Sequence, residues 1–354
     1  MRNKSRLIEC MLDEIELQRG YLNGATINSV YFGGGTPSVL NPDELHAILD
    51  KICSRFNLSA NAEISLEANP DDLSLPYLRD LYDLGINRLS IGVQSFFDND
   101  LTWMNRRHNR DQSVNSVEIS KKAGFKNISI DLIYGIPGMK PGKWKENLEI
   151  AFNNKINHLS AYHLTLEKKT VYFHNVSKGL MEVPDETAGL QQYEILMDIA
   201  EREGFMHYEI SNFCLPGWFS VHNTSYWLQK HYLGIGPSAN SFNGRSRQWN
   251  IRNNSLYIKK IEEGIIPCES EDLDLIKSYN EYVLTSLRTM WGTDLKVIKN
   301  NFGDELSDHF NRESRTFLEQ GKLEQLGSRV VLGRTGKFFA DGIISQLFWT
   351  GNGF

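Results

Sequence analysis

The sequence has few cysteines and no long apolar run, and both shortages exclude classes of protein. The cysteines, Cys10, Cys53, Cys214 and Cys268, are too scattered for a CxxC pair or a zinc-type cluster. We therefore expect free thiols in a reducing compartment. No stretch approaches the roughly 18 consecutive apolar residues of a spanning helix, and the charged start lacks the apolar run of a secretory signal. We expect a cytoplasmic chain without a membrane span, while peripheral contact with a membrane is left open.

The chain also lacks a large excess of charge of either sign. It has 38 basic and 44 acidic residues, which give a formal net charge of −6. A weak negative field does not attract nucleic acid, so we expect no nucleic-acid partner. What the sequence does have is length and apolar content. Its 354 residues, 40% of them hydrophobic, suffice for one large domain and a smaller one.

Short apolar runs alternate with segments of helical periodicity through the first part of the chain. The runs, each about as long as one strand, fall at residues 27–32, 62–66, 88–93, 127–133, 158–164 and 205–210. A helix over residues 5–19 precedes the first run. Alternation of this kind predicts an α/β fold with a parallel sheet, because two parallel strands need a crossover connection.

Polar residues at the ends of these runs bear on whether the sheet is open or closed. The glycines 33–35, Glu67, Gln94, Asp131 and Tyr162 lie at or near the carboxyl ends of five runs. In a (β/α) barrel these ends form one rim where active sites assemble, whereas an open sheet binds ligands at a switch point. Both architectures satisfy the alternation, but polar groups on consecutive strands favour the barrel.

The second part of the chain has a different pattern. Residues 214–255 are rich in glycine, asparagine and aromatic residues and are too long for an ordinary connection. Helical periodicity returns afterwards, followed by a hairpin-like pair of apolar runs and a last amphipathic helix, at 275–290, 295–300, 305–320, 323–326, 330–332 and up to 348. We therefore predict a small helical, winged-helix-like domain. The predicted division is a barrel at 1–213, a connecting region at 214–262 and a C-terminal helical domain at 263–354.

A run of glycines follows the first predicted strand. Without a Cβ atom, Gly33, Gly34 and Gly35 let a ligand approach bare backbone amides. The same run is equally typical of a tight turn between a strand and a helix. It is not a P-loop, because no Gly-Lys-Ser/Thr follows.

Two acidic residues lie where an unpaired charge would be costly. Glu67 points into the predicted barrel and needs an ammonium group, ligand hydroxyls or a salt bridge within the chain. We expect the salt bridge for Glu63 rather than for Glu67. Asp131 lies inside an apolar strand, which demands a hydrogen-bonded role. Binding a ribose diol is one such role.

Two further polar side chains lie near the predicted rim. The amide of Gln94 can donate and accept at once. Arg106 can bind a carboxylate with two hydrogen bonds. We expect its neighbour Arg107 to lie in an exposed basic turn.

A histidine with aromatic residues nearby in the sequence lies in the long connecting region. His222 begins the segment HNTSYW, and Trp218, Phe219 and Tyr232 are close in sequence. Such surroundings suit a flat porphyrin whose iron takes an axial nitrogen. A histidine beside aromatic residues is nevertheless more often structural.

In combination, these segments resemble a known family. GGGTPS, ISLEANP, RLSIGVQSF, MNRRH and DLIYGIPG, in this order, resemble the radical S-adenosylmethionine (SAM) proteins related to the oxygen-independent coproporphyrinogen III oxidase. The later segments YEISNF, HNTSYW and YLGIGPSA are more similar to the haem chaperone branch, HemW. The resemblance runs from about Asn28 to the C-terminus. It implies a partial (β/α)6 TIM-like barrel without its first strand, followed by a small helical, winged-helix-like domain of the HemN type.

Carried residue by residue onto this sequence, the resemblance implies two binding sites. The methionine end of SAM would lie against Gly34, Gly35 and Thr36. The residues that would contact the rest of SAM are Glu67, Gln94, Arg106 and Asp131. Of these, Gln94 and Asp131 would lie at the sugar. The HNxxYW segment implies that His222 binds haem.

One family feature is absent from the given sequence. The family ligates a [4Fe–4S] cluster with a CxxxCxxC loop ahead of the GGGTP segment, and only Cys10 lies in that region. Either Met1 is an internal start or a truncation point, or the cluster has been lost. We therefore assign no metal ligands to this chain, and we expect it not to cleave SAM reductively.

The sequence thus predicts a HemW-like haem chaperone of the radical SAM family. It would bind haem and SAM, with a [4Fe–4S] cluster in the complete form, and deliver haem to acceptor proteins. One alternative is the coproporphyrinogen III oxidase itself, which converts propionates to vinyl groups through a 5′-deoxyadenosyl radical. Another is an ordinary (β/α)-barrel enzyme without a cluster. The sequence leaves the haem acceptor and the oligomeric state open.

Overall fold

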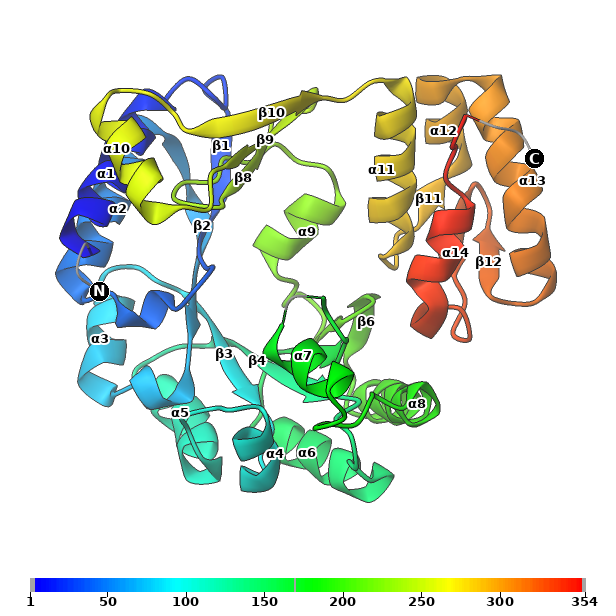
Figure 1. Ribbon diagram of the computed structural model, residues 1–354, viewed down its shortest axis with the longest axis horizontal. Coiled ribbons are helices and arrows are strands. Elements are labelled where there is room, and N and C mark those ends of the chain that lie inside the picture. Colours follow the sequence, from blue (N-terminus) through cyan, green and yellow to red (C-terminus); the bar gives the residue numbers. More distant parts are fainter. Residues whose placement is uncertain (1–3, 169, 352–354) are drawn as a thin grey trace. The chain divides into compact units, whose positions relative to one another are not determined.

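The computed structural model describes residues 4–168 and 170–351, and strands alternate with helices in its first part (Figure 1). The elements up to the fifth strand are α1 (Lys4–Leu17), β1 (Thr26–Phe32), α2 (Pro42–Arg55), β2 (Asn57–Ala68), α3 (Leu75–Asp83), β3 (Arg88–Gln94), α4 (Asp98–Trp103), α5 (Arg110–Lys122), β4 (Asn127–Tyr134), α6 (Pro141–Asn153) and β5 (His158–His163). They are followed by α7 (Val171–Ser177), α8 (Glu186–Arg202), β6 (Met206–Glu209) and β7 (Asn212–Cys214).

The described chain forms two compact units. We call the first the terminal unit; it takes in Met1–Val30, Leu40–Ala62 and Val221–Phe354, as far as these are described. The second, which we call the barrel unit, consists of Tyr31–Val39 and Glu63–Ser220. The three-part division drawn from the sequence stays a prediction.

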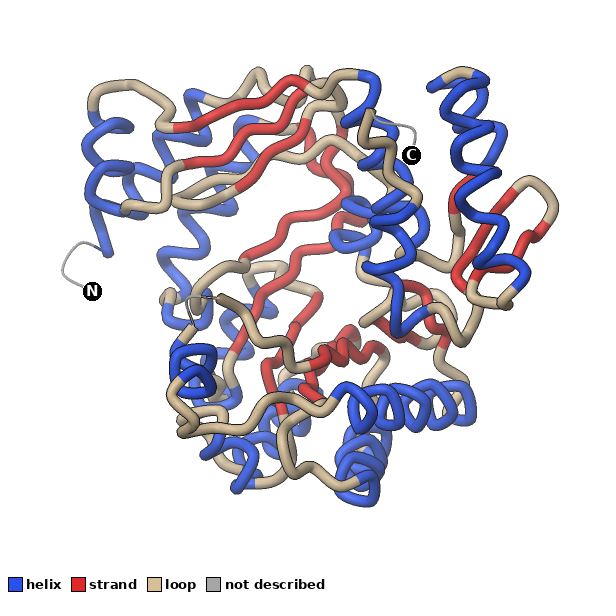
Figure 2. The backbone as a smooth tube through the Cα atoms, turned by 45° about the vertical axis from the view of Figure 1, so that its right-hand side comes forward, coloured by secondary structure: helices blue, strands red, loops and turns tan. Residues whose placement is uncertain are grey.

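A curled sheet forms the core of the barrel unit and continues into β1 and β2. Its strand order is β1-β2-β3-β4-β5-β7-β6, and Figure 2 shows its strands in red with helices in blue around them. The strands β2, β3, β4 and β5 pair in parallel, which confirms the predicted parallel half-barrel. Helix α5 packs on β3, and α8 packs on β4.

The last two strands of the sheet differ from the predicted pattern. The run at 205–210 forms β6, but β6 lies at the edge of the sheet and does not pair with β5. The short strand β7 lies between them and is antiparallel to both. With three residues, β7 is too short to show a period, so sequence reasoning could not separate it from the connecting region.

Alternation along the parallel strands explains why one face of this sheet is apolar. Successive side chains of a strand point to opposite faces. The buried apolar residues of one face of β3 and β4 are Leu89, Ile91, Val93, Ile128, Ile130 and Leu132. The opposite, inner face carries polar side chains at the alternate positions, including Arg88, Ser90, Ser129, Asp131, His158 and Ser160.

The amino-terminal ends of these strands hold a buried polar network. Arg88 donates to Asn127 over 2.6 Å and lies 3.9 Å from Glu63, so the expected salt bridge of Glu63 is present. His158 lies 2.7 Å from Ser129 Oγ and 2.7 Å from the Tyr208 hydroxyl. Burial, and then the charge of Arg88, hold the pKa of His158 well below its ordinary value. The imidazole is therefore neutral, and this end of the half-barrel is closed by paired groups.

The terminal unit contains more regular structure than the sequence pattern indicated. The stretch 214–255 contains α9 (Val221–Trp227), β8 (Asn240–Phe242) and β9 (Ser246–Asn250), and it reaches the start of α10 (Asn254–Glu262). With β10 (Cys268–Asp272), the strands form an antiparallel sheet of order β10-β9-β8. These strands are short and polar, which hides them from periodicity.

The C-terminal part follows the predicted order of helices and hairpin. Its elements are α11 (Leu275–Leu287), β11 (Thr293–Asp294), α12 (Leu295–Phe302), α13 (Asp304–Glu319), β12 (Leu323–Leu326), β13 (Arg329–Leu332) and α14 (Ala340–Gln346). The strands β12 and β13 pair as an antiparallel hairpin, and β11 pairs with the other side of β13. The predicted helices and hairpin are confirmed here.

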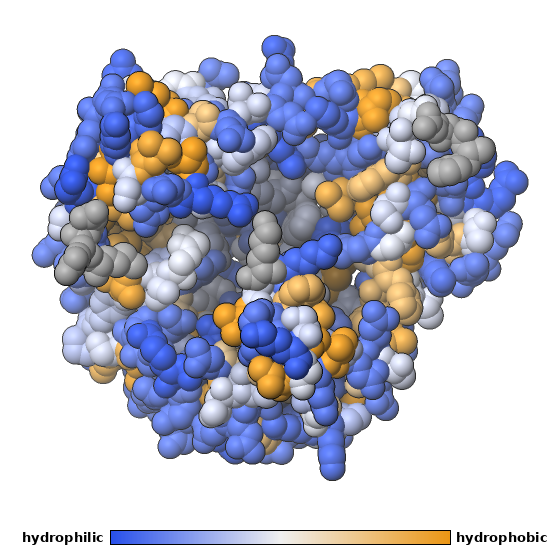
Figure 3. Space-filling view, viewed as in Figure 1, coloured by the Kyte–Doolittle hydropathy of each residue, from blue (hydrophilic) through white to orange (hydrophobic). Residues whose placement is uncertain are grey.

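The surface seen in Figure 3 is mostly hydrophilic, with small apolar patches between polar groups. No helix within residues 4–168 and 170–351 combines the length and the apolar character that crossing a membrane requires.

A buried carboxylate on α1 forms hydrogen bonds with later segments of the terminal unit. Glu14 is fully buried, and its oxygens accept hydrogen bonds from Gly236 N at 2.7 Å, Asn250 Nδ2 at 2.6 Å and Tyr257 OH at 2.5 Å. Burial raises the pKa of Glu14, and these hydrogen bonds oppose the rise. Cys10, one turn earlier on the same helix, packs against Tyr257 in an apolar cluster.

Replacing Glu14 by alanine should destabilise the protein. The substitution leaves three buried donors without their acceptor, so we expect the free energy of unfolding to fall by about 3 kcal/mol. Urea denaturation followed by circular dichroism measures this loss. Glu9→Ala, at an exposed position of the same helix, should stay within about 0.5 kcal/mol of the parent. Equal stabilities of the two variants would contradict the role of Glu14.

Candidate functional site

The parallel register brings several predicted residues to one face of the barrel unit. Glu67 of β2 lies opposite Ser90 of β3, and Asp131 of β4 lies opposite Ser160 of β5. The Ser90 hydroxyl donates to Asp131 Oδ1 over 3.3 Å. The charge of Glu67 also acts on Asp131 and raises its pKa. Glu67 and Asp131 therefore face the same space.

The glycines after β1 have different structural roles. Gly34 and Gly35 have φ angles of 74° and 86°, in the left-handed region that favours glycine, and a Cβ on either would meet no atom within 4 Å. Their backbone therefore faces open space. A Cβ on Gly33 would overlap Cε1 of Tyr31 and would lie 3.0 Å from Oε1 of Glu67. Thr36, half-buried, accepts from Val39 N in the turn that ends the run.

Glu67 connects the glycine run to β2. Its Oε1 accepts from the Tyr31 hydroxyl over 2.6 Å, and its Oε2 accepts from Gly34 N over 3.2 Å. Burial, and then the charge of Glu67, raise the pKa of Tyr31, so the phenol remains a donor. Among the described residues, Glu67 thus accepts hydrogen bonds from a hydroxyl and a backbone amide. Sequence reasoning missed Tyr31, although its alternation in the first strand offered a signal.

Gln94 lies at an irregularity where β3 ends. Its φ is 66°, and the pairing of β3 with β4 shifts register between Ile91 and Gln94. A Cβ on Gly92 would lie 2.9 Å from Nε2 of Gln94. Gly92 belongs to the inner face by alternation, so the Gln94 amide is folded over that face.

Asp131 is the most perturbed carboxyl group of this site. Burial raises its pKa to about 6, with the hydroxyls of Ser160 and Ser90 opposing the rise. Arg106 is exposed after α4, yet partial loss of water lowers the pKa of its guanidinium, while the charges of Asp131 and Asp71 oppose that shift. The electrostatic field of Asp131 thus reaches Arg106, which the sequence assigned to the same ligand.

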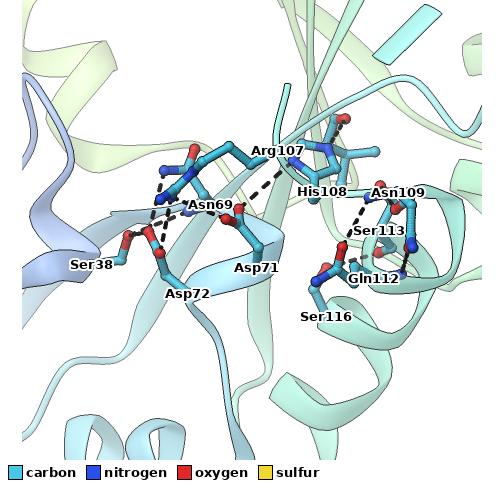
Figure 4. A network of polar contacts seen from close by, with 11 residues as sticks. Ser38, Asn69, Asp71, Asp72, Arg107, His108, Asn109, Gln112, Ser113 and Ser116 are labelled. Carbon is cyan, nitrogen blue, oxygen red and sulfur yellow. Dashed lines mark hydrogen bonds and ion pairs between the residues drawn. The ribbon is translucent and has the colours of Figure 1, made fainter. Parts of the chain in front are cut away.

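A polar network ties together the loops that follow β1, β2 and α4 (Figure 4). Ser38 donates to Asp72 over 2.7 Å, and Arg107 contacts Asp72 at 3.2 Å and Asp71 at 3.0 Å. His108, buried beside them, lies 3.0 Å from the carbonyl of Val93. Arg107 is indeed an exposed residue, with 68% of its side chain accessible. The network makes the three loops one connected rim.

The second candidate site surrounds His222 in the terminal unit. His222 lies on α9, and its Nδ1 is 3.4 Å from Ser29 Oγ. Its ring stands edge-on to Tyr226, with centroids 4.9 Å apart, and Tyr226 in turn contacts Tyr232. Burial lowers the pKa of His222 to about 4, so the imidazole is neutral at neutral pH. A neutral imidazole among aromatic rings has the lone pair that a metal centre requires.

The four thiols form no disulfide. Cys10 and Cys214 are buried, Cys268 is half-buried and Cys53 is exposed, and all are free. Burial raises the pKa of Cys214 to about 12. Across the part of the chain that the structure describes, no group of three histidine, cysteine or acidic side chains is arranged to hold a metal ion.

Two family models match this chain and define its class. The model of the radical SAM superfamily matches residues 4–151, and the model of the HemN C-terminal domain matches residues 273–339. The solved structure of coproporphyrinogen III oxidase (HemN) from Escherichia coli superposes with a TM-score of 0.84 at 20% identity, over 98% of this chain and 84% of that one. The chain therefore has the fold of a radical SAM protein with a HemN-type C-terminal domain.

Sequence relatives place the chain within that class. It is 35% identical to the heme chaperone HemW of Lactococcus lactis, over 81% of this chain and 78% of that protein. It is 32% identical to the heme chaperone HemW of Bacillus subtilis, over 89% of this chain and 84% of that protein. The corresponding protein of Mycobacterium tuberculosis is 30% identical over 94% of this chain and 84% of its own length. The chain belongs to the HemW family.

Gly33→Ala tests the packing of the glycine run. The new methyl group overlaps the Tyr31 ring, so the ring must move and its bond to Glu67 must weaken. We expect a loss of about 1–3 kcal/mol in the free energy of unfolding, measured by denaturant titration. Gly142→Ala is the control, because a Cβ there meets nothing within 4 Å. Equal stability of Gly33→Ala and the parent would contradict the packing described.

Proposed function

We propose that this chain is a haem chaperone of the HemW type, which binds SAM in the barrel unit and haem at His222 and passes haem to acceptor proteins. The support is the identity of 30–35% to proteins that carry the chaperone name, over most of the chain. We propose a cytoplasmic location, because free and scattered cysteines suit a reducing compartment. We propose no nucleic-acid partner, because the chain has no excess of basic charge.

The proposed SAM site uses the open backbone of the glycine run and the side chains of the rim. Gly34, Gly35 and Thr36 hold the methionine end, because open space lies before both glycines. The residues proposed to contact the rest of SAM are Glu67, Gln94, Arg106 and Asp131. In this arrangement Glu67, already bound to Tyr31 and Gly34, fixes the glycine run and offers its remaining lone pairs to the SAM ammonium. Asp131 accepts hydrogen bonds from the ribose hydroxyls.

The thiols of this chain do not fit a [4Fe–4S] cluster. Such clusters are held by several thiolates, whereas the four cysteines are free and two of them are buried. We therefore assign no step to a cluster. A cluster is proposed only for a form of the protein that carries a CxxxCxxC segment.

Haem is the proposed cargo, with the His222 imidazole as iron ligand. The low pKa of His222 keeps the ring neutral and able to bind iron at neutral pH. The aromatic rings of Tyr226 and Tyr232 offer an apolar surface beside it. The sequence of this segment, HNTSYW, is the one that pointed to haem.

The oxidase alternative has less support. The structure named coproporphyrinogen III oxidase (HemN) is only 20% identical, so its likeness shows the fold and not the activity. The relatives that are at least 30% identical over most of the chain carry the chaperone name instead.

SAM binding should weaken in acid as Asp131 takes up a proton. The ionised carboxylate accepts hydrogen bonds from both ribose hydroxyls, and its pKa is about 6. We therefore expect the dissociation constant for SAM to rise about tenfold between pH 7 and pH 5, measured by isothermal titration calorimetry. Asp131→Asn should bind SAM weakly, and its dissociation constant should not rise between pH 7 and pH 5. The same pH dependence in Asp131→Asn and the parent would count against the assignment.

Haem binding should depend on His222. Adding ferric haem to the protein should shift the Soret band, and His222→Ala should lose that shift while keeping its circular dichroism spectrum. His231→Ala is the matched control, since His231 is an exposed histidine of the same connecting region. An unchanged Soret band in the His222→Ala complex would overturn this ligand assignment. No haem binding by the parent protein would overturn the chaperone function.

A further inference from the structure

The Asp131 carboxyl group lies between two serines from the neighbouring strands. Ser90 of β3 donates to Asp131 Oδ1 over 3.3 Å. Ser160 of β5 lies opposite Asp131 in the parallel register, and its hydroxyl favours the ionised form of the carboxyl group. Ser160 is 3% exposed, and Ser90 is half-buried. Neither serine has a role in the proposed contacts with SAM.

Charged and titratable groups face Asp131 from every neighbouring strand and from the rim. Glu67 of β2 disfavours the ionised carboxylate, whereas Arg88 of β3 favours it. Arg106 brings a second positive charge from the loop after α4. The phenols of Tyr31 and Tyr162, neutral because burial raises their pKa values, complete the surroundings. With charges of both signs present, the Ser90 hydroxyl is a neutral donor that contacts the carboxylate directly.

We propose that Ser90 and Ser160 are positioning residues that hold the Asp131 carboxylate ionised and oriented toward the ribose hydroxyls of SAM. The proposal rests on the proposed SAM site. A carboxylate fixed by donors from both neighbouring strands cannot rotate freely, so its remaining lone pairs keep one direction. Two adjacent hydroxyls of a ribose match a carboxylate held in that way.

The first test measures Asp131 in the ligand-free protein and does not depend on SAM. Carboxyl carbon NMR, with Asp131→Asn used for assignment, gives the pKa of Asp131 in the parent, Ser90→Ala and Ser160→Ala. Because each serine stabilises the ionised form, we expect each substitution to raise this pKa by about half a unit to one unit. Ser129→Ala is the matched control, since Ser129 lies on the same face but contacts His158. It should leave the pKa of Asp131 unchanged.

The second test follows SAM binding against pH by calorimetry. In Ser90→Ala and Ser160→Ala, the pH below which SAM binding weakens should rise by the same amount as the pKa of Asp131. At pH 8, where the carboxylate is ionised in all variants, loss of its orientation should weaken binding about three- to tenfold. Ser160→Thr, which keeps the hydroxyl, should recover most of the affinity.

The results separate this proposal from the proposed function. An unchanged or lowered pKa of Asp131 in both alanine variants would overturn the positioning role, whether or not SAM binds. A raised pKa together with no SAM binding by the parent would support the interaction but overturn the SAM site and, with it, the positioning role. If Ser160→Ala does not fold, Ser90→Ala, at a half-buried position, and Ser160→Thr decide the matter.

Discussion

The parallel register of β2, β3, β4 and β5 is the constraint on which the rest of the structure depends. It places Glu67 opposite Ser90 and Asp131 opposite Ser160. Because side chains alternate between faces, a slip of one residue would turn each of these groups to the helix-covered face. The glycine run is tied into the same arrangement, since Gly34 donates to Glu67. Residues distant in the chain therefore share one polar face only in this register.

A polar face inside a half-barrel requires partners for its buried groups, and the partners change along the strands. At the amino-terminal end, Arg88 is paired with Glu63 and Asn127, and His158 is neutral between two hydroxyls. Burying such groups is tolerable because each is paired or uncharged. Toward the carboxyl end, Asp131 accepts a hydrogen bond from the Ser90 hydroxyl, and burial raises its pKa to about 6. The amino-terminal end, where the buried groups are paired, thus stabilises the fold. The carboxyl end, where Asp131 has weaker partners, is suited to bind a polar ligand.

Much of this fold could be predicted from the sequence, because long periodic segments encode it. The parallel strands, the C-terminal helices and the hairpin β12–β13 each follow a clear pattern. The short strand β7 and the sheet β8–β10 could not be found, since a few polar residues show no period. For the site, the pattern identified Glu67 and Asp131 as acids that face into the sheet's polar side. It did not reveal Tyr31 or Ser160, whose roles arise from pairing between strands.

Burial acts in opposite directions on the two titratable groups that matter most for the proposed ligands. It raises the pKa of Asp131 to about 6 and lowers the pKa of His222 to about 4. The cause is the same, since loss of water disfavours an anionic carboxylate and a cationic imidazole alike. At neutral pH both groups therefore present lone pairs, Asp131 to the proposed ribose hydroxyls and His222 to the proposed haem iron. On acidification Asp131 is protonated first, so the two functions are separated by about two pH units rather than lost together.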